Sequence, residues 1–209
     1  GDFYWFNELN GLIYFAVADC TGHGVPGAFM SMIGIDKLNQ SLIDKKIEEP
    51  AEILKNINNS IKNALKQNNI QSGSKDGMDI ILCSYDKQKQ ILQFAGANRP
   101  LWIIRNKELI EYKPDKLSIA GYTEYDQAYK NNILQVQKGD SIYAFTDGIV
   151  DQFGGPDGKK FMSKRMKELL LNIHSKPMHD HELLLKKAVE EWQGKLEQID
   201  DILVLGMRI

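Results

Sequence analysis

The segment from Leu12 to Gly27 constrains the fold of this chain more than any other. It begins with an apolar run, Leu12 to Ala18, which predicts a buried strand. The strand ends at Asp19, two glycines then permit a tight turn, and Pro26 opens an apolar-periodic helix. A carboxylate at the end of a buried strand, beside a glycine-rich turn and a helix start, suits a hard metal ion or an anion.

The size and charge of the chain restrict the classes of protein to which it can belong. Its 209 residues, 43% of them hydrophobic, can bury the core of one domain. A formal net charge of −2 supplies no basic field, so nucleic acid is not expected as a partner. The two cysteines, Cys20 and Cys83, lie in or beside apolar runs and favour reduced thiols, which indicates a cytoplasmic domain.

The beginning of the chain leads directly into strand-like residues. We therefore expect a domain excised from a longer chain and lacking its extreme N-terminal strand, with a full-length protein that could be tethered to a membrane. Residues 3–6 and 12–18 flank turn residues and predict a hairpin. Such a hairpin would bring Asp2 across from Asp19, although an exposed terminal acid is the alternative for Asp2.

Hydrophobic periodicity predicts the remaining elements. Helices are expected over residues 26–44, 50–68, 161–173 and 182–196. Closely spaced strands at 79–85, 91–95, 101–105 and 109–112 predict an antiparallel meander. Residues 133–136 and 141–145 read as a further strand pair, and residues 202–209 as the last strand.

Acidic residues recur at the predicted strand ends. Asp147 follows an apolar strand and precedes a glycine, which repeats the pattern at Asp19. Asp200 and Asp201 stand at the start of the last strand, which in an antiparallel sheet can be the edge where neighbouring strands end. These acids therefore predict a shared carboxylate pocket. For Asp79, a role in a turn and a catalytic role are equally plausible.

Four aspartate-containing motifs, in order along nearly the whole chain, carry a family resemblance. They are Gly1-Asp2-Phe3-Tyr4, the ten residues from Val17 to Pro26, Phe145-Thr146-Asp147-Gly148 and Asp200-Asp201-Ile202. With these motifs the chain resembles the metal-dependent protein phosphatases of the protein phosphatase 2C-like class, and most closely their bacterial SpoIIE-type branch. The resemblance implies an α+β fold, a four-layer α-β-β-α sandwich of two mainly antiparallel sheets flanked by helices, in a single domain over residues 1–209.

The resemblance also implies two Mn²⁺ or Mg²⁺ ions at the edge of the sheets. By that similarity Asp19 would bridge the two ions, and the backbone carbonyl of Cys20 would be a further ligand. Asp2 would bind a metal directly or through water. Oxygen ligands suit either ion, so the residues do not choose between Mn²⁺ and Mg²⁺.

The same similarity assigns roles to residues outside the first motif. Asp147 and Asp200 would complete the shell of the second ion, with Asp201 as a neighbouring candidate. His23 matches a glycine-flanked histidine for which a proton-donor role has been proposed. Arg99, which by default would form a surface ion pair, is our candidate for contacting the substrate phosphate.

The function implied is hydrolysis of phosphoserine or phosphothreonine on a protein by a metal-activated water, in bacterial signalling. Relatives of this type act on phosphorylated anti-sigma-factor antagonists and respond to upstream sensor domains, and a homodimer is possible. Two alternatives stay open at this stage. The domain could hydrolyse a small phosphate ester, or it could be a catalytically silent signalling module that keeps the fold.

Overall fold

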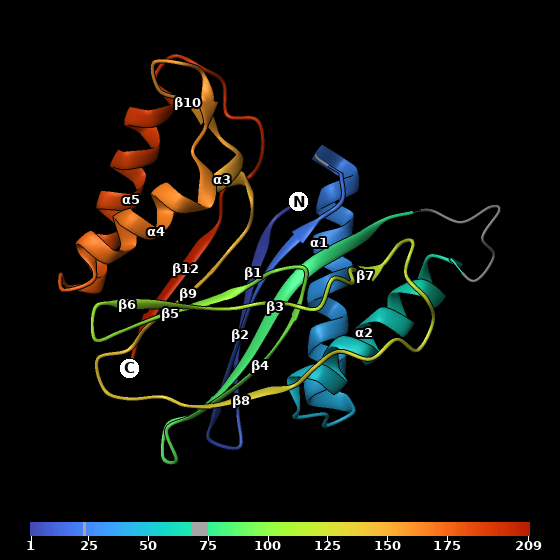
Figure 1. The fold of residues 1–209 in the computed structure, drawn as a ribbon. Coiled ribbons are helices and arrows are strands. Elements are labelled where there is room, and N and C mark those ends of the chain that lie inside the picture. The colour runs from blue at the N-terminus through green and yellow to red at the C-terminus, as the bar shows by residue number, and fades with distance from the viewer. Residues whose placement is uncertain (23, 68–74) are drawn as a thin grey trace.

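Two antiparallel sheets lie face to face between two layers of helices, as seen in a computed structural model of the chain (Figure 1). The structure describes residues 1–22, 24–67 and 75–209. Helices α1 and α2 cover one sheet, and helices α4 and α5 cover the other (Figure 1). This arrangement confirms the predicted α+β fold with four layers.

The first sheet is built around the longest strands. Its hydrogen-bonded order is β1 (Phe3–Leu9), β2 (Leu12–Cys20), β3 (Gly77–Asp86), β4 (Ile91–Ala97) and β8 (Asn132–Gln135), with β7 (Ile119–Ala120) pairing with β3. In β2 the side chains of Phe15 and Val17 face the second sheet, whereas Tyr14 and Ala16 face helices α1 and α2. The sequence of β2 is a continuous apolar run because the second sheet covers one of its faces and the helices cover the other.

The second sheet is smaller. Its order is β12 (Val204–Arg208), β9 (Ser141–Phe145), β5 (Leu101–Arg105) and β6 (Glu108–Tyr112). A separate two-stranded ribbon consists of β10 (Phe153–Gly154) and β11 (Lys159–Lys160).

The helices begin and end close to the predicted positions. They are α1 (Gly24–Asn39), which continues as the π-helical segment η1 (Gln40–Asp44), then α2 (Pro50–Ala64), the short α3 (Gly148–Asp151), α4 (Met162–Ile173) and α5 (Met178–Gln193). Pro50 is the first residue of α2, as its preference for the first turn predicts. None of the helices in the described ranges combines the length and the hydropathy needed to span a bilayer.

The predicted meander is wrong at one connection. Strands β3 and β4 pair in the first sheet, but β5 and β6 pair in the second. The chain leaves the first sheet at Asn98, which has a positive φ of 58° and therefore turns the backbone out of the plane of β4. The break between β4 and β5 places Arg99 between the two sheets.

The predicted pairing of residues 133–136 with 141–145 is also wrong. Strand β8 pairs with β4 in the first sheet, whereas β9 lies between β12 and β5 in the second. The segment between them is thus a second crossing from one sheet to the other. It carries β9, with Asp147 after it, to the side of the sandwich that faces β2.

Candidate metal centre

The hairpin and the last strand set the positions of the acidic residues. Strand β1 pairs with β2 so that Phe3 lies opposite Ala18, which confirms the predicted hairpin and places Asp2 next to the end of β2. In the second sheet Val204 lies opposite Phe145, so the residues before β12 run beside those after β9. The acids from both sheets therefore gather at one edge of the sandwich.

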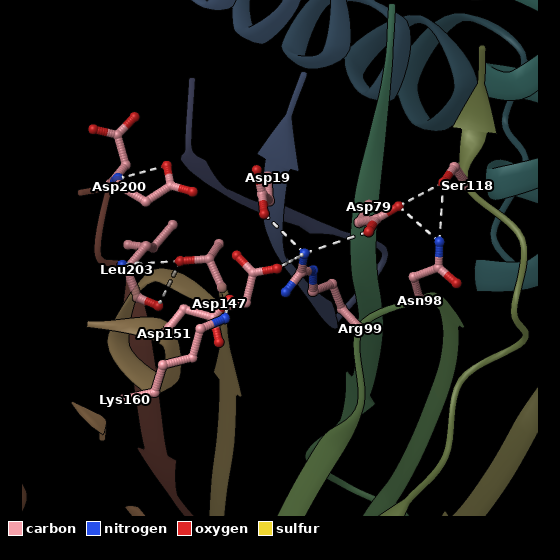
Figure 2. Close-up of polar contacts among 12 residues, drawn as sticks. Asp19, Asp79, Asn98, Arg99, Ser118, Asp147, Asp151, Lys160, Asp200 and Leu203 are labelled. Carbon is pink, nitrogen blue, oxygen red and sulfur yellow. Dashed lines mark hydrogen bonds and ion pairs between the residues drawn. The ribbon is translucent and has the colours of Figure 1, made fainter. Parts of the chain in front are cut away.

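Arg99 lies at the centre of this edge. Its Nη2 atom is 2.8 Å from Oδ2 of Asp19, 2.8 Å from Oδ2 of Asp147 and 3.3 Å from Oδ2 of Asp79 (Figure 2). The side chain is only 10% exposed, so the default prediction that Arg99 forms a surface ion pair is wrong. A single guanidinium is thus shared by three carboxylates from strands β2 and β3 and from the end of β9.

For Asp79 the sequence left a role in a turn and a catalytic role open, and the structure places it at the site. It lies directly opposite Asp19 in the pairing of β3 with β2, and it contacts Arg99. The signal in the sequence is an acid at the start of an otherwise apolar strand. That signal is weak in sequence, because an aspartate beside a glycine-rich segment is ordinary turn chemistry.

Asp2 and Asp201 lie together on the other side of the cluster. The backbone N–H of Asp2 donates to Oδ2 of Asp201 at 3.3 Å, and the terminal amino group of Gly1 bonds to the same oxygen. Oδ2 of Asp2 is buried and has no hydrogen-bond partner among the described residues. A buried acceptor of this kind calls for a cation or a proton donor.

The neighbouring acid Asp200 takes a different position. Its side chain is exposed, and its Oδ1 accepts the backbone N–H of Asp201 at 2.8 Å. Figure 2 shows Asp200 apart from the carboxylates that contact Arg99, with no dashed line that joins it to them. The structure therefore gathers Asp2, Asp19, Asp147 and Asp201 at one edge, with Asp200 at its margin.

The electrostatics of the cluster reflect crowding of negative charge in a partly dry site. Burial raises the pKa of Asp19 to about 8, Arg99 opposes this rise, and the neighbouring carboxylates Asp2 and Asp147 add to it. Burial also raises the pKa of Asp2. For Arg99, burial lowers the pKa, but the hydrogen bond and charge of Asp147 together with the charges of Asp19 and Asp79 outweigh it, and the pKa is raised. An added positive charge would therefore stabilise the ionised form of these carboxylates.

Cys20 and His23 complete the set of predicted residues. The Cys20 thiol is free and buried, and burial raises its pKa to about 12, in keeping with a packing role for this side chain. Ser31 Oγ lies 4.0 Å from its sulfur. His23 lies outside the described residues.

The residues present fit a hard divalent cation. The donors are carboxylate oxygens, which Mg²⁺ and Mn²⁺ prefer, and among the described residues the buried Oδ2 of Asp2 has no hydrogen-bond partner. Within residues 1–22, 24–67 and 75–209, no three His, Cys, Asp or Glu side chains already form a ligand arrangement. The oxygens of Asp19 and Asp147 instead contact the guanidinium of Arg99.

Gly148 keeps the two acidic segments of the second sheet in contact. A Cβ atom at this position would lie 2.0 Å from the carbonyl oxygen of Asp201, which is backbone and cannot yield. We expect Gly148→Ala to lower the free energy of unfolding by about 1–3 kcal/mol and to displace Asp147 from Asp201. Chemical denaturation measures the loss of stability.

The matched control for this substitution is Gly206→Ala in the adjacent strand β12. There the nearest atom to a new Cβ is the terminal methyl of Met178 at 2.9 Å, which can rotate away. The control should cost less stability than Gly148→Ala. Equal losses from the two variants would contradict the role assigned to the close approach at Gly148.

Known proteins contain domains that are similar to this chain in sequence and in structure. A family model described as stage II sporulation protein E (SpoIIE) matches residues 10–209. The phosphoserine phosphatase RsbU of Bacillus subtilis is 26% identical over 188 residues, which are 83% of this chain and 52% of RsbU. The chain thus spans about half the length of this curated relative.

Solved structures share the fold. The SiaA-PP2C domain of Pseudomonas aeruginosa superposes with a TM-score of 0.87 at 30% identity, and the match covers 100% of this chain and 80% of that domain. The PP2C phosphatase domain of SpoIIE from Bacillus subtilis, solved with a fragment of its regulatory domain, superposes with a TM-score of 0.76 at 22% identity, covering 100% of this chain and 58% of that one.

Proposed function

Because this chain belongs to the SpoIIE family, we propose that it is a metal-dependent phosphatase that hydrolyses phosphoserine or phosphothreonine on a protein. The observation that carries the proposal is the gathering of Asp19 and Asp147, from different sheets, around one partly buried positive charge. The similarity to RsbU, a phosphoserine phosphatase, supports the choice of substrate.

The proposed ligands are the acids at the edge of the sandwich. Asp19 would bridge two ions, Mn²⁺ or Mg²⁺, with Asp2 and the backbone carbonyl of Cys20 on one side. Asp147 and Asp200 would serve the second ion, and the contact of Asp201 with the backbone of Asp2 makes Asp201 a further candidate. When bound, two such ions supply Lewis-acid chemistry that activates a water molecule and offsets charge on the phosphoryl group.

The other residues of the site act on the substrate. Arg99 is proposed to contact the substrate phosphate, since its guanidinium carries a permanent positive charge beside Asp19 and Asp147. His23 is proposed as the proton donor to the leaving serine or threonine oxygen. The Cys20 thiol has no part in the reaction, because its raised pKa keeps it protonated at neutral pH.

The partners follow from the family. We propose a phosphorylated protein substrate of the anti-sigma-factor-antagonist type, a sensor domain that controls activity, and a homodimer. Helix α1 offers a surface for such control, since Val25, Phe29 and Met32 form a stripe with 69%, 59% and 66% of their surfaces exposed. The free thiols of Cys20 and Cys83 support a cytoplasmic domain, and a membrane tether in the full-length protein stays part of the proposal.

A single catalytic domain over residues 1–209 is the organisation that we propose. Its support is the continuity of the packing. One buried cluster lies between α1, α2 and the first sheet, a second lies between the sheets, and a third lies under α4 and α5. The clusters share β2, β5 and β9, whose alternate side chains enter different layers.

Metal-dependent phosphate release is the test of the proposed function. We expect the protein to release phosphate from a serine-phosphorylated protein substrate when Mn²⁺ or Mg²⁺ is present and to stop when a chelator removes the ion. Release from small esters at equal or greater kcat/KM would instead favour a small-ester hydrolase. No release from either class, with Mn²⁺ bound, would favour a silent signalling module.

A further inference from the structure

Asp79 is held in place by groups other than Arg99. Its Oδ1 accepts from Ser118 Oγ at 2.7 Å and from Asn98 Nδ2 at 2.9 Å, while its Oδ2 faces Arg99 (Figure 2). Asn98 and Ser118 also bond to each other at 2.9 Å. The carboxylate is therefore fixed by a closed set of hydrogen bonds that does not involve the other acids of the site.

Arg99 uses the same oxygens that a divalent ion would need. Its contacts with Asp19 and Asp147 are both 2.8 Å, shorter than the 3.3 Å contact with Asp79. A guanidinium keeps its charge at every accessible pH, so it repels a metal ion that approaches these carboxylates. While it stays buried, it also cannot lose its carboxylate partners without a large desolvation cost.

We propose that Arg99 is an internal cation that competes with divalent ions for Asp19 and Asp147, and that Asp79 is the positioning residue that retains Arg99 when those ions bind. The inference rests on the proposed function, since it takes Asp19 and Asp147 as metal ligands. Asp79 suits the retaining role because it already contacts Arg99 and its orientation is fixed from the opposite side by Asn98 and Ser118.

Charge balance supports this exchange. When all three carboxylates are ionised, as ligation of a metal ion by Asp19 and Asp147 requires, one guanidinium leaves an excess negative charge of two, which one divalent ion would neutralise without expelling Arg99. If Arg99 moved wholly to Asp79, that pair would be neutral, and the oxygens of Asp19 and Asp147 would be free to bind metal. Arg99 would thereby set the metal concentration at which the site fills.

The affinity for Mn²⁺, measured by calorimetry or by electron paramagnetic resonance of free Mn²⁺, tests the proposal without an activity readout. Arg99→Gln should tighten Mn²⁺ binding about tenfold, because a competing charge is removed. Arg99→Lys, which keeps the charge, should bind Mn²⁺ more like the parent protein. Asp79→Asn should weaken Mn²⁺ binding about fivefold, because Arg99 then has only Asp19 and Asp147 as charged partners.

The double variant separates a positioning residue from a ligand. In the Arg99→Gln background, Asp79→Asn should change the Mn²⁺ affinity by less than about twofold, since no guanidinium is left to retain. Ser118→Ala, which removes one anchor of Asp79, should shift the affinity in the same direction as Asp79→Asn. It provides a milder variant if Asp79→Asn folds poorly.

Arg105→Gln is the matched control. Arg105 forms a close ion pair with Asp140, 2.6 Å between Nη2 and Oδ2, in the second sheet away from the acidic edge. The Arg105→Gln substitution should lower the free energy of unfolding without changing the Mn²⁺ affinity. Thermal unfolding in chelator shows that each variant is folded before its affinity is compared.

Three results would overturn the inference. An unchanged or weaker affinity in Arg99→Gln would show that Arg99 does not compete with the ion. An equal loss from Asp79→Asn in both backgrounds would make Asp79 a metal ligand itself. Failure of the parent protein and of Arg99→Gln to bind Mn²⁺ at all would overturn the metal assignment of the proposed function, and with it this inference.

Discussion

Asp19→Asn is expected to lower phosphatase kcat/KM about a thousandfold or more, the largest loss from any single substitution in the site. Asp19 would bridge both ions in the proposed function, and it lies between the Asp2 side of the cluster and Asp147. An amide keeps the size of the side chain but loses the negative charge. Phosphate release with saturating Mn²⁺ and a phosphoprotein substrate is the measurement.

Excess metal should not rescue Asp19→Asn, because neither ion would keep its proposed set of ligands. The matched control is Asp157→Asn, since Asp157 is an exposed acid with 68% of its side chain accessible, in the segment between β10 and β11. That variant should retain the parent activity. Parent-like activity in Asp19→Asn would remove Asp19 from the metal centre.

Asp147→Asn is expected to lower kcat/KM about a hundredfold at a fixed, low Mn²⁺ concentration. Asp147 would serve only one ion, so part of the loss should be recovered as the Mn²⁺ concentration is raised. The variant also removes one of the two 2.8 Å contacts of Arg99. A titration of activity against Mn²⁺ distinguishes this partial rescue from the behaviour of Asp19→Asn.

Asp151→Asn is the control for Asp147→Asn, because it removes a nearby negative charge and keeps the proposed ligand Asp147. Asp151 lies one helical turn further along, in α3, and pairs with Lys160 at 2.8 Å (Figure 2). Its contact is with the β10–β11 ribbon, so its loss should leave the Mn²⁺ dependence unchanged. If Asp151→Asn and Asp147→Asn shifted that dependence equally, the effect of Asp147 would be one of general charge rather than of ligation.

The mismatch between the predicted meander and the observed sheets has a physical explanation. Strands β4 and β5 each bury apolar side chains on both faces, and the connection between them is short. Either strand could fill either sheet, so periodicity alone cannot distinguish a hairpin from a crossing. The crossing depends on the packing of the two sheets around the buried cluster between them.

Local sequence determined the elements of this protein and the positions of its acids. The apolar run of Leu12 to Ala18 predicted β2, and the residues after it placed Asp19 at the end of a buried strand. The register of the hairpin followed from the turn between its strands, so the approach of Asp2 to the end of β2 was also predictable. These features depend on neighbours in the chain, which is why sequence patterns report them.

Only the tertiary structure determined which groups the acidic side chains contact. It placed Arg99 between the sheets and among Asp19, Asp79 and Asp147, and it brought Asp201 rather than Asp200 against Asp2. These contacts join residues up to 199 positions apart, and they depend on which sheet each strand enters. Long-range electrostatics in a buried site are set by that choice, because a single crossing of the chain moves a charge from the surface to the centre of the cluster.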